Sequence, residues 1–197
     1  MNSAFEYECV TLYPGELHIA NTPTVIWTVV GSCLAIIFYH APSRLGAIAH
    51  AQLGTPADFG GIPCSDTCPK PCFAKVSGEN PFKYVSCCIH YMTNAFRKKN
   101  IPTREIEVKL FGGSNILGVS NVVKTVGETN IEVAYETLGQ CRLTVTSMDL
   151  GGKKGRTLYF YSDTGEVFVK NHSAKMDLRE NIVPMYDEEN LALIQKS

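Results

Sequence analysis

The predicted fold is built around TVVGSCLAIIFYHAPSRLGAIAHAQL, residues 28–53, because this stretch holds two apolar runs of strand-like composition joined by a turn. The runs Cys33–His40 and Leu45–Leu53 are rich in β-branched, aromatic and small apolar residues, a composition typical of buried strands. Between them, APSR (41–44) supplies proline and serine, which favour turns. We therefore predict an antiparallel hairpin at the centre of a sheet.

The hairpin register determines which side chains meet. If His40 lies opposite Leu45, then Cys33 lies opposite Gln52. His50 is then diagonal to Cys33 on the same face, at a spacing of about 7–8 Å that long side chains can bridge. A slip of one residue would turn His50 to the opposite face. The predicted register thus places a thiol and an imidazole within reach of each other.

A thiol within reach of an imidazole is an activated nucleophile. His50 can take the proton of Cys33 and hold the thiolate as an ion pair, so we expect Cys33 to have a lowered pKa and to react first among the eight cysteines. Thr28 could accept the other imidazole N–H and fix the tautomer, as the third member of a triad does. Gly31 and Ser32 could form a tight turn whose N–H groups provide an oxyanion site. The alternatives are a buried, inert cysteine and an ordinary turn serine.

Composition excludes several classes of protein. The chain has 197 residues, 45% hydrophobic and 19% charged, with a net charge of -1, which argues against a disordered protein and against nucleic acid as a partner. The first ten residues, MNSAFEYECV, lack the layout of a secretory signal, and no apolar run is long enough to span a membrane. We expect a cytoplasmic protein without membrane insertion, whose cysteines are mostly reduced.

Other strands and helices follow from residue pattern. Two helices are predicted, at Tyr84–Lys99 and at Glu128–Leu138, the second ending at Gly139. The segment 55–82 is proline-rich and irregular, and we expect an inserted surface loop there. Beyond the hairpin, six further strands are expected, at Glu8–Leu12, Thr24–Val30, Glu105–Phe111, Arg142–Asp149, Thr157–Tyr161 and Glu166–Lys170.

The insertion carries a second cluster of cysteines. Cys64, Cys68 and Cys72 are spaced by three intervening residues, and they could bind Zn²⁺ or an iron–sulfur cluster with a fourth ligand from Cys87, Cys88 or His90. This spacing is not that of a two-residue zinc knuckle. A loop of reduced thiols without a metal is the favoured interpretation, and no cofactor is expected.

The remaining candidate motifs have structural explanations. His18, His40 and His172 have no predicted thiol partner, whereas His90 follows Cys87 by three residues on a predicted helix, where a pair is more often packing than a metal site. DLGGKKGR (149–156) combines glycine with lysine but lacks the order of a phosphate-binding loop, so we expect a connecting turn in which Asp149 is structural.

The chain resembles the CheD chemoreceptor glutamine deamidases of bacterial and archaeal chemotaxis. The resemblance rests on the order of motifs along most of the chain: LYPGE (12–16), TVVGSC (28–33), LGAIAHAQL (45–53), FGGS (111–114), VGETNIEVAYETL (126–138) and DLGGKKGR (149–156). The family's catalytic residues are a cysteine after Gly-Ser, a histidine seventeen residues later and an upstream threonine, which here correspond to Cys33, His50 and Thr28. One departure is His40, where the family usually has an acidic residue.

The resemblance implies a fold and an activity. The implied fold is α+β, a single domain of layered mixed β-sheets with helices packed outside. We expect the deamidase domain to span 1–170, with the insertion at 55–82, and an extension at 171–197. The implied activity is cysteine-dependent hydrolysis of glutamine side chains on the cytoplasmic domains of methyl-accepting receptors, with release of ammonia. The implied second partner is a CheC-type phosphatase. The alternative is a non-catalytic adaptor that binds the phosphatase or the receptor.

Overall fold

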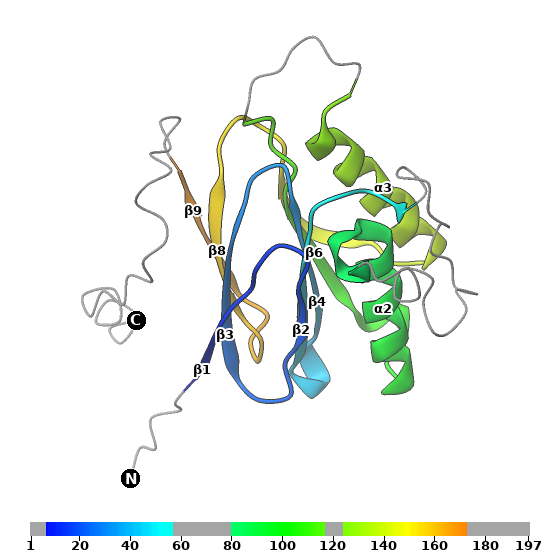
Figure 1. Ribbon diagram of the computed structural model, residues 1–197. Helices are drawn as coiled ribbons and strands as arrows, with labels where there is room; N and C mark the ends of the chain where they lie inside the picture. Colours follow the sequence, from blue (N-terminus) through cyan, green and yellow to red (C-terminus); the bar gives the residue numbers. More distant parts are fainter. Residues whose placement is uncertain (1–6, 57–79, 117–123, 173–197) are drawn as a thin grey trace.

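Two mixed β-sheets face each other, and two helices cover the outer face of one of them (Figure 1). The computed structural model describes residues 7–56, 80–116 and 124–172. The arrangement is the predicted α+β fold, in which the helices lie on one side of the molecule only (Figure 1). In the described ranges, no helix is both long and apolar enough to cross a membrane.

The element bounds agree closely with the sequence pattern. The strands are β1 (Glu8–Thr11), β2 (Leu17–Ile19), β3 (Thr24–Val30), β4 (Leu34–His40), β5 (Leu45–Ala51), β6 (Glu107–Gly112), β7 (Val145–Leu150), β8 (Arg156–Tyr161) and β9 (Val167–Asn171). The helices are α2 (Val85–Lys98) and α3 (Val126–Gln140), with short 3-10 turns at Ala41–Ser43, Pro81–Lys83 and Thr103–Glu105.

The predicted hairpin forms with the predicted register. β4 and β5 pair antiparallel, with His40 opposite Leu45 and Leu34 opposite Ala51 at the other end. The hairpin lies inside the five-stranded sheet, whose order is β2-β5-β4-β6-β7, and the four-stranded sheet has the order β1-β3-β8-β9. Both sheets mix parallel and antiparallel pairs.

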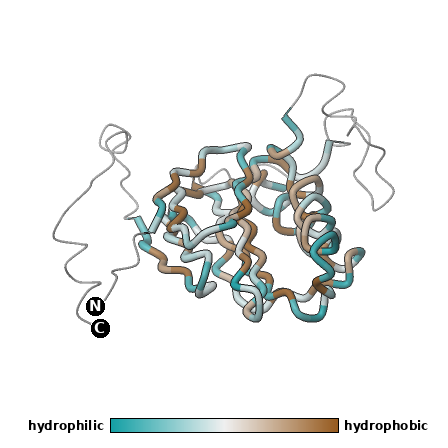
Figure 2. Tube along the Cα trace, turned by 90° about the horizontal axis from the view of Figure 1, so that it is seen from below, coloured by the Kyte–Doolittle hydropathy of each residue, from teal (hydrophilic) through white to brown (hydrophobic). Residues whose placement is uncertain are grey.

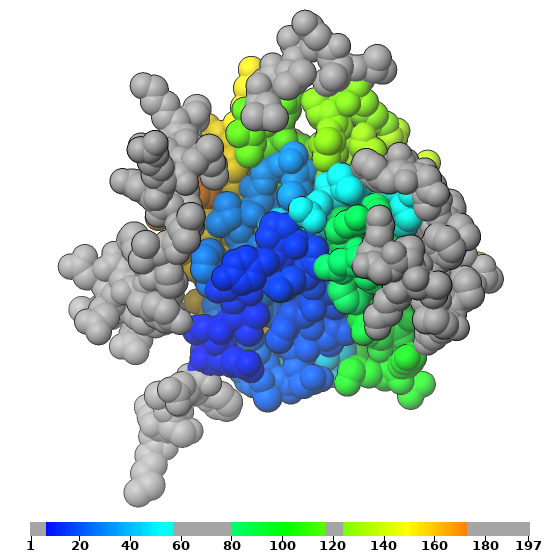
Figure 3. All heavy atoms as spheres, in the orientation of Figure 1, coloured from blue at the N-terminus to red at the C-terminus, as the bar shows by residue number. Residues whose placement is uncertain are grey.

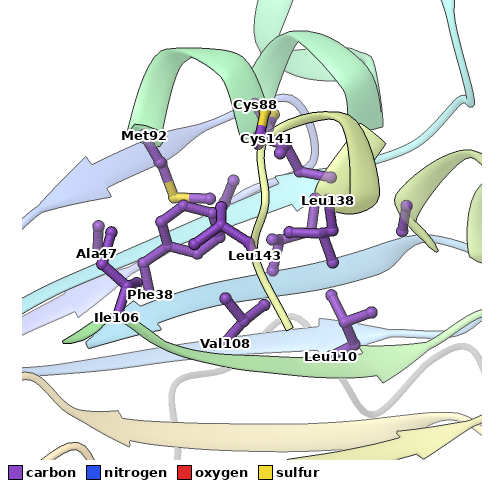
Figure 4. Close-up of a cluster of buried hydrophobic side chains, with 14 of the residues drawn as sticks. Phe38, Ala47, Cys88, Met92, Ile106, Val108, Leu110, Leu138, Cys141 and Leu143 are labelled. Carbon is purple, nitrogen blue, oxygen red and sulfur yellow. The ribbon is translucent and has the colours of Figure 1, made fainter. Parts of the chain in front are cut away.

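The hairpin is buried on both faces because it separates two hydrophobic cores. All seven residues of β4 and all seven of β5 are buried. One core packs between the five-stranded sheet and the helices, where Phe38 and Ala47 meet Met92 and Leu138 (Figure 4). The other lies between the two sheets and includes Ala35 and Ile48 from the hairpin. Hydrophobic stretches of the trace accordingly run through the interior in Figure 2.

The structure corrects two details of the sequence-based prediction. The short strand β2 was not predicted, because three residues are too few to show an alternating pattern. Helix α3 was predicted over Glu128–Leu138, with its end at Gly139. In the structure it spans Val126–Gln140, so it begins two residues earlier and continues past Gly139. Its start is set by a capping box, in which Thr125 and Glu128 each bond the other's backbone N–H.

Candidate active site

Thr28 and His50 meet between the two sheets, and Cys33 packs against the same core. On β3, residues alternate between buried and half-buried, and Thr28 belongs to the buried set that faces the five-stranded sheet. His50 lies opposite Ala35, a member of the core between the sheets. Cys33 is half-buried and packs against the same core. The ladder ends at the Leu34–Ala51 pair, one residue after Cys33, and Cys33 and His50 border the same core, which is consistent with the predicted same-face arrangement.

A hydrogen-bond chain fixes the tautomer of His50. The Thr28 hydroxyl donates to the Leu12 carbonyl oxygen at 2.7 Å, and its oxygen lies 2.7 Å from His50 Nδ1. A hydroxyl has a single proton, and the carbonyl of Leu12 can only accept. The Thr28 oxygen must therefore accept a hydrogen bond from His50 Nδ1–H, which leaves the Nε2 lone pair free to act as a base. Among the described residues, nothing hydrogen-bonds His50 Nε2.

A tight turn holds the backbone of His50. The turn spans Tyr13–Glu16, and Gly15 has φ +83°, a conformation that the residue after proline in such a turn requires. His50 donates its N–H to the Glu16 carbonyl at 2.9 Å and accepts the N–H of Gly15 at 2.8 Å. Figure 3 shows the blue N-terminal segment lying beside the cyan segment that follows β5. The LYPGE motif thus positions the histidine.

Burial makes both members of the pair neutral in the resting protein. Burial lowers the pKa of His50 to about 4, against smaller opposing effects of the Leu12 carbonyl and the Glu16 charge. Burial also raises the pKa of the Cys33 thiol, an effect that its own backbone N–H partly offsets. The expectation of a lowered Cys33 pKa is therefore wrong for the resting state, because loss of solvent outweighs every stabilising contact of the thiolate.

The turn that carries Cys33 leaves two N–H groups available. The carbonyl groups of Gly31 and Cys33 accept the N–H groups of Ser114 and Gly113, at 2.7 and 2.9 Å. Neither the Ser32 N–H nor the Cys33 N–H donates to another described residue. These two groups adjoin the Cys33 side chain and could stabilise a negatively charged oxygen.

Two groups near the site were not predicted from the sequence. One is the Leu12 carbonyl, which no side-chain pattern could reveal. The other is Asn130 on α3, a fully buried residue whose side chain bonds the carbonyl groups of Ser32 and Gln52. An asparagine inside an otherwise amphipathic helix pattern was the available signal.

The other candidate residues have separate surroundings. His40 contacts Ser43 and Glu105, and His90 lies 3.5 Å from Cys141. Cys64, Cys68 and Cys72 lie outside the described residues, as does most of the predicted insertion. Within the ranges that are described, no group of three or more His, Cys, Asp or Glu side chains could hold a metal ion.

The DLGGKKGR segment forms the predicted turn and contains an ion pair whose arginine is buried. Arg156 is buried and bonds both carboxylate oxygens of Asp149 at 2.7 Å. It also donates to the Ser114 hydroxyl at 2.7 Å and to the Gly151 carbonyl at 3.0 Å. These contacts connect β7, β8 and the segment after β6, beside the turn of Cys33.

Comparison with known proteins identifies relatives along most of the chain. A family model described as "CheD chemotactic sensory transduction" matches residues 69–171. A protein of Geobacter sulfurreducens named "Probable chemoreceptor glutamine deamidase CheD 2" is 38% identical over 162 residues, 82% of this chain and 88% of the relative. Proteins named "Probable chemoreceptor glutamine deamidase CheD" are 32% identical in Maridesulfovibrio salexigens, over 82% of this chain and 90% of the relative, and 32% identical in Thermococcus kodakarensis, over 81% and 90%.

The family-model match begins after the three candidate residues. Thr28, Cys33 and His50 all precede residue 69, so the matched range does not include them. The roles of these residues are therefore a separate question from the family of the chain.

Proposed function

Because the chain belongs to the CheD family, a family of chemoreceptor glutamine deamidases, we propose that Cys33, His50 and Thr28 are its catalytic triad. The substrate is a glutamine side chain on a chemoreceptor, and the products are glutamate and ammonia. The observation that supports this assignment best is the hydrogen-bond chain from Leu12 through Thr28 to His50, which leaves Nε2 free on the face that carries Cys33.

The proposed reaction proceeds through a thioester. His50 Nε2 takes the proton of Cys33 as the sulfur attacks the carboxamide carbon of the glutamine. The tetrahedral intermediate collapses, and ammonia leaves with the proton that His50 returns. A water molecule that gives a proton to His50 then attacks the thioester, which releases glutamate and restores the thiol. Since both groups are neutral at rest, the first proton moves during the attack rather than before it.

The negative charge of the intermediate needs donors beside the sulfur. The N–H groups of Ser32 and Cys33 are suited to this role, because neither donates to another described residue and both adjoin the nucleophile. Glycine at position 31 leaves room for the Ile116 side chain, which would lie 2.3 Å from a Cβ there. In the same proposal the protein acts in the cytoplasm, where receptor signalling domains lie. It uses no metal. Its second partner is a CheC-type phosphatase.

The direct test measures ammonia release from receptor cytoplasmic fragments. Wild-type protein should release ammonia and convert glutamine to glutamate, which peptide mass spectrometry locates. Cys33→Ala should abolish both, because no other group can form the thioester. Cys9→Ala is the matched control, since Cys9 is an exposed, free cysteine away from the site, and it should retain full activity.

Two results would contradict the proposal. Undiminished ammonia release by Cys33→Ala would reject the nucleophile. No release by wild-type protein that binds the receptor fragments would favour the adaptor alternative. Elemental analysis of protein purified without chelator tests the absence of a metal.

A further inference from the structure

Asn130 joins the two segments that carry the nucleophile and the base. It lies on α3 and is fully buried. Its Nδ2 donates to the Ser32 carbonyl at 3.0 Å and to the Gln52 carbonyl at 2.9 Å. Ser32 immediately precedes Cys33, and Gln52 follows His50 by two residues. One amide group thus links both halves of the site.

This link continues the hairpin after its backbone pairing ends. The last pair of the β4–β5 ladder is Leu34 with Ala51, so no ladder hydrogen bond reaches the carbonyl groups of Ser32 and Gln52. Two carbonyl groups need two donors, which a carboxamide N–H₂ supplies and a carboxylate does not. The reversed amide would place an oxygen against two carbonyl oxygens, so hydrogen bonding fixes the orientation.

The Ser32 bond also orients the next N–H group. The carbonyl of Ser32 and the N–H of Cys33 belong to one planar, trans peptide unit, in which they point in opposite directions. By holding the carbonyl toward α3, Asn130 directs the Cys33 N–H away from the helix. That N–H donates to no other described residue, and it lies on the side of the peptide where its own sulfur lies.

We propose that Asn130 is a positioning residue that aims the Cys33 N–H at the oxygen of the tetrahedral intermediate, through its hydrogen bond to the Ser32 carbonyl. The inference rests on the proposed function for its catalytic consequence, but the geometry is independent of it. The Asn130 oxygen has no partner among the described residues, so the donors are the part of this side chain that the site uses. A buried carboxamide with one unpaired atom is costly, and its two hydrogen bonds offset that cost.

The first test uses the resting wild-type protein and needs no substrate. Hydrogen exchange followed by NMR should find the Asn130 side-chain N–H₂ protected and the Cys33 backbone N–H unprotected. Protection of the Cys33 N–H would overturn the inference, because that group would then be bonded within the protein and unavailable to substrate. Rapid exchange of the Asn130 amide would overturn it as well.

The second test separates positioning from folding. Asn130→Asp keeps the shape but loses the donors, and Asn130→Ala removes the group. Both should lower kcat for ammonia release about 10²-fold with little change in KM, as expected when an oxyanion donor is misaligned. Alkylation of Cys33 by iodoacetamide, which needs no oxyanion site, should proceed at the wild-type rate. Asn130→Ser, which retains one donor, should give an intermediate kcat.

The matched control is Thr137→Ala, on the same helix. Thr137 is also buried, but its hydroxyl bonds only the Val133 carbonyl within α3. Its kcat should remain at the wild-type value. Unchanged kcat in the folded Asn130 variants would overturn the inference, and so would a parallel loss of kcat, alkylation rate and melting temperature. Wild-type protein without deamidase activity would instead reject the proposed function, while the exchange measurement would still decide the role of Asn130.

Discussion

At the scale of single residues, the site depends on which nitrogen of His50 carries the proton. The Thr28 hydroxyl accepts from Nδ1–H only because its own proton is engaged by the Leu12 carbonyl. The Leu12 carbonyl and the Thr28 hydroxyl therefore keep the proton on Nδ1 and leave Nε2 unprotonated. A histidine without this chain would divide between two tautomers, and only one of them presents a base to the sulfur.

Removal of the Thr28 hydroxyl should therefore impair catalysis more than folding. We expect Thr28→Val, which has nearly the same shape, to lower kcat about 10- to 100-fold, the usual effect of losing a group that orients a histidine. Thr28→Ser keeps the hydroxyl and should stay close to the wild-type kcat. Ammonia release at saturating receptor fragment provides the measurement. Equal activity of the Val and Ser variants would show that the tautomer is set by other means.

The burial of His50 makes the protein sensitive to acid. Its pKa is about 4 in the folded chain and 6.5 in the reference state. Between these pH values the unfolded chain binds a proton at His50 that the folded chain does not. The contribution of His50 to the free energy of unfolding is therefore complete above pH 6.5 and is lost as pH falls toward 4. The total loss is about 3 kcal/mol. Denaturant unfolding at pH 7.5 and pH 4.5 should show a smaller decrease for His50→Gln than for wild type, and identical decreases would contradict the assignment.

At the scale of elements, α3 must approach the nucleophile turn closely. A Cβ at Gly127 would lie 2.3 Å from the carbonyl oxygen of Gly113, a backbone atom that cannot move aside easily. The N–H of that same Gly113 bonds the Cys33 carbonyl. The position of the helix and the position of the nucleophile are therefore coupled through one residue.

Two glycine substitutions on α3 test this coupling. Gly127→Ala should cost about 1–3 kcal/mol of stability, as expected for overpacking, and should lower kcat as well. Gly139→Ala should raise stability by about 0.5–1 kcal/mol, because no atom lies within 4 Å of its Cβ and alanine favours the helix. Thermal unfolding and ammonia release distinguish the two. A neutral Gly127→Ala would show that the helix can shift without disturbing the turn.

At the scale of the whole molecule, Arg156 connects the two sheets near the site. It lies on β8 of the four-stranded sheet, whereas Asp149 lies on β7 of the five-stranded sheet. The hydrogen bonds of Arg156 hold the pKa of Asp149 below its usual range. The ion pair joins a buried arginine of one sheet to a half-buried aspartate of the other, and it fixes how the sheets meet at this end.

Without the Asp149 carboxylate, the buried Arg156 guanidinium should lack a counter-charge. Asp149→Ala should destabilise the protein by about 1–3 kcal/mol, because Arg156 keeps its bonds to neutral groups but loses its counter-charge. Glu132→Ala is the matched control, since the Lys124–Glu132 pair is exposed, and it should change stability by about 0.5 kcal/mol or less. Urea unfolding at neutral pH measures both, and equal effects would contradict a bridging role.

The sequence predicted local features better than long-range ones. The hairpin register was predicted correctly because APSR limits the turn and both strands are apolar throughout. The approach of Thr28 to His50 was a hypothesis from strand order, and the geometry agrees with it. The contacts of Asn130 and Arg156 could not be predicted, because each joins segments distant in the chain. The Cys33 pKa was mispredicted because burial of the pair depends on the packing of both sheets.

The last acceptor in the His50 chain is the Leu12 carbonyl, which belongs to the main chain. No amino-acid substitution at position 12 can delete an atom that every residue possesses. The side chain at position 12, which packs in the core between the sheets, can therefore change without removing the acceptor of the Thr28 hydroxyl. A comparison of side chains alone would therefore find Thr28 and His50 but would miss the main-chain acceptor that orients them.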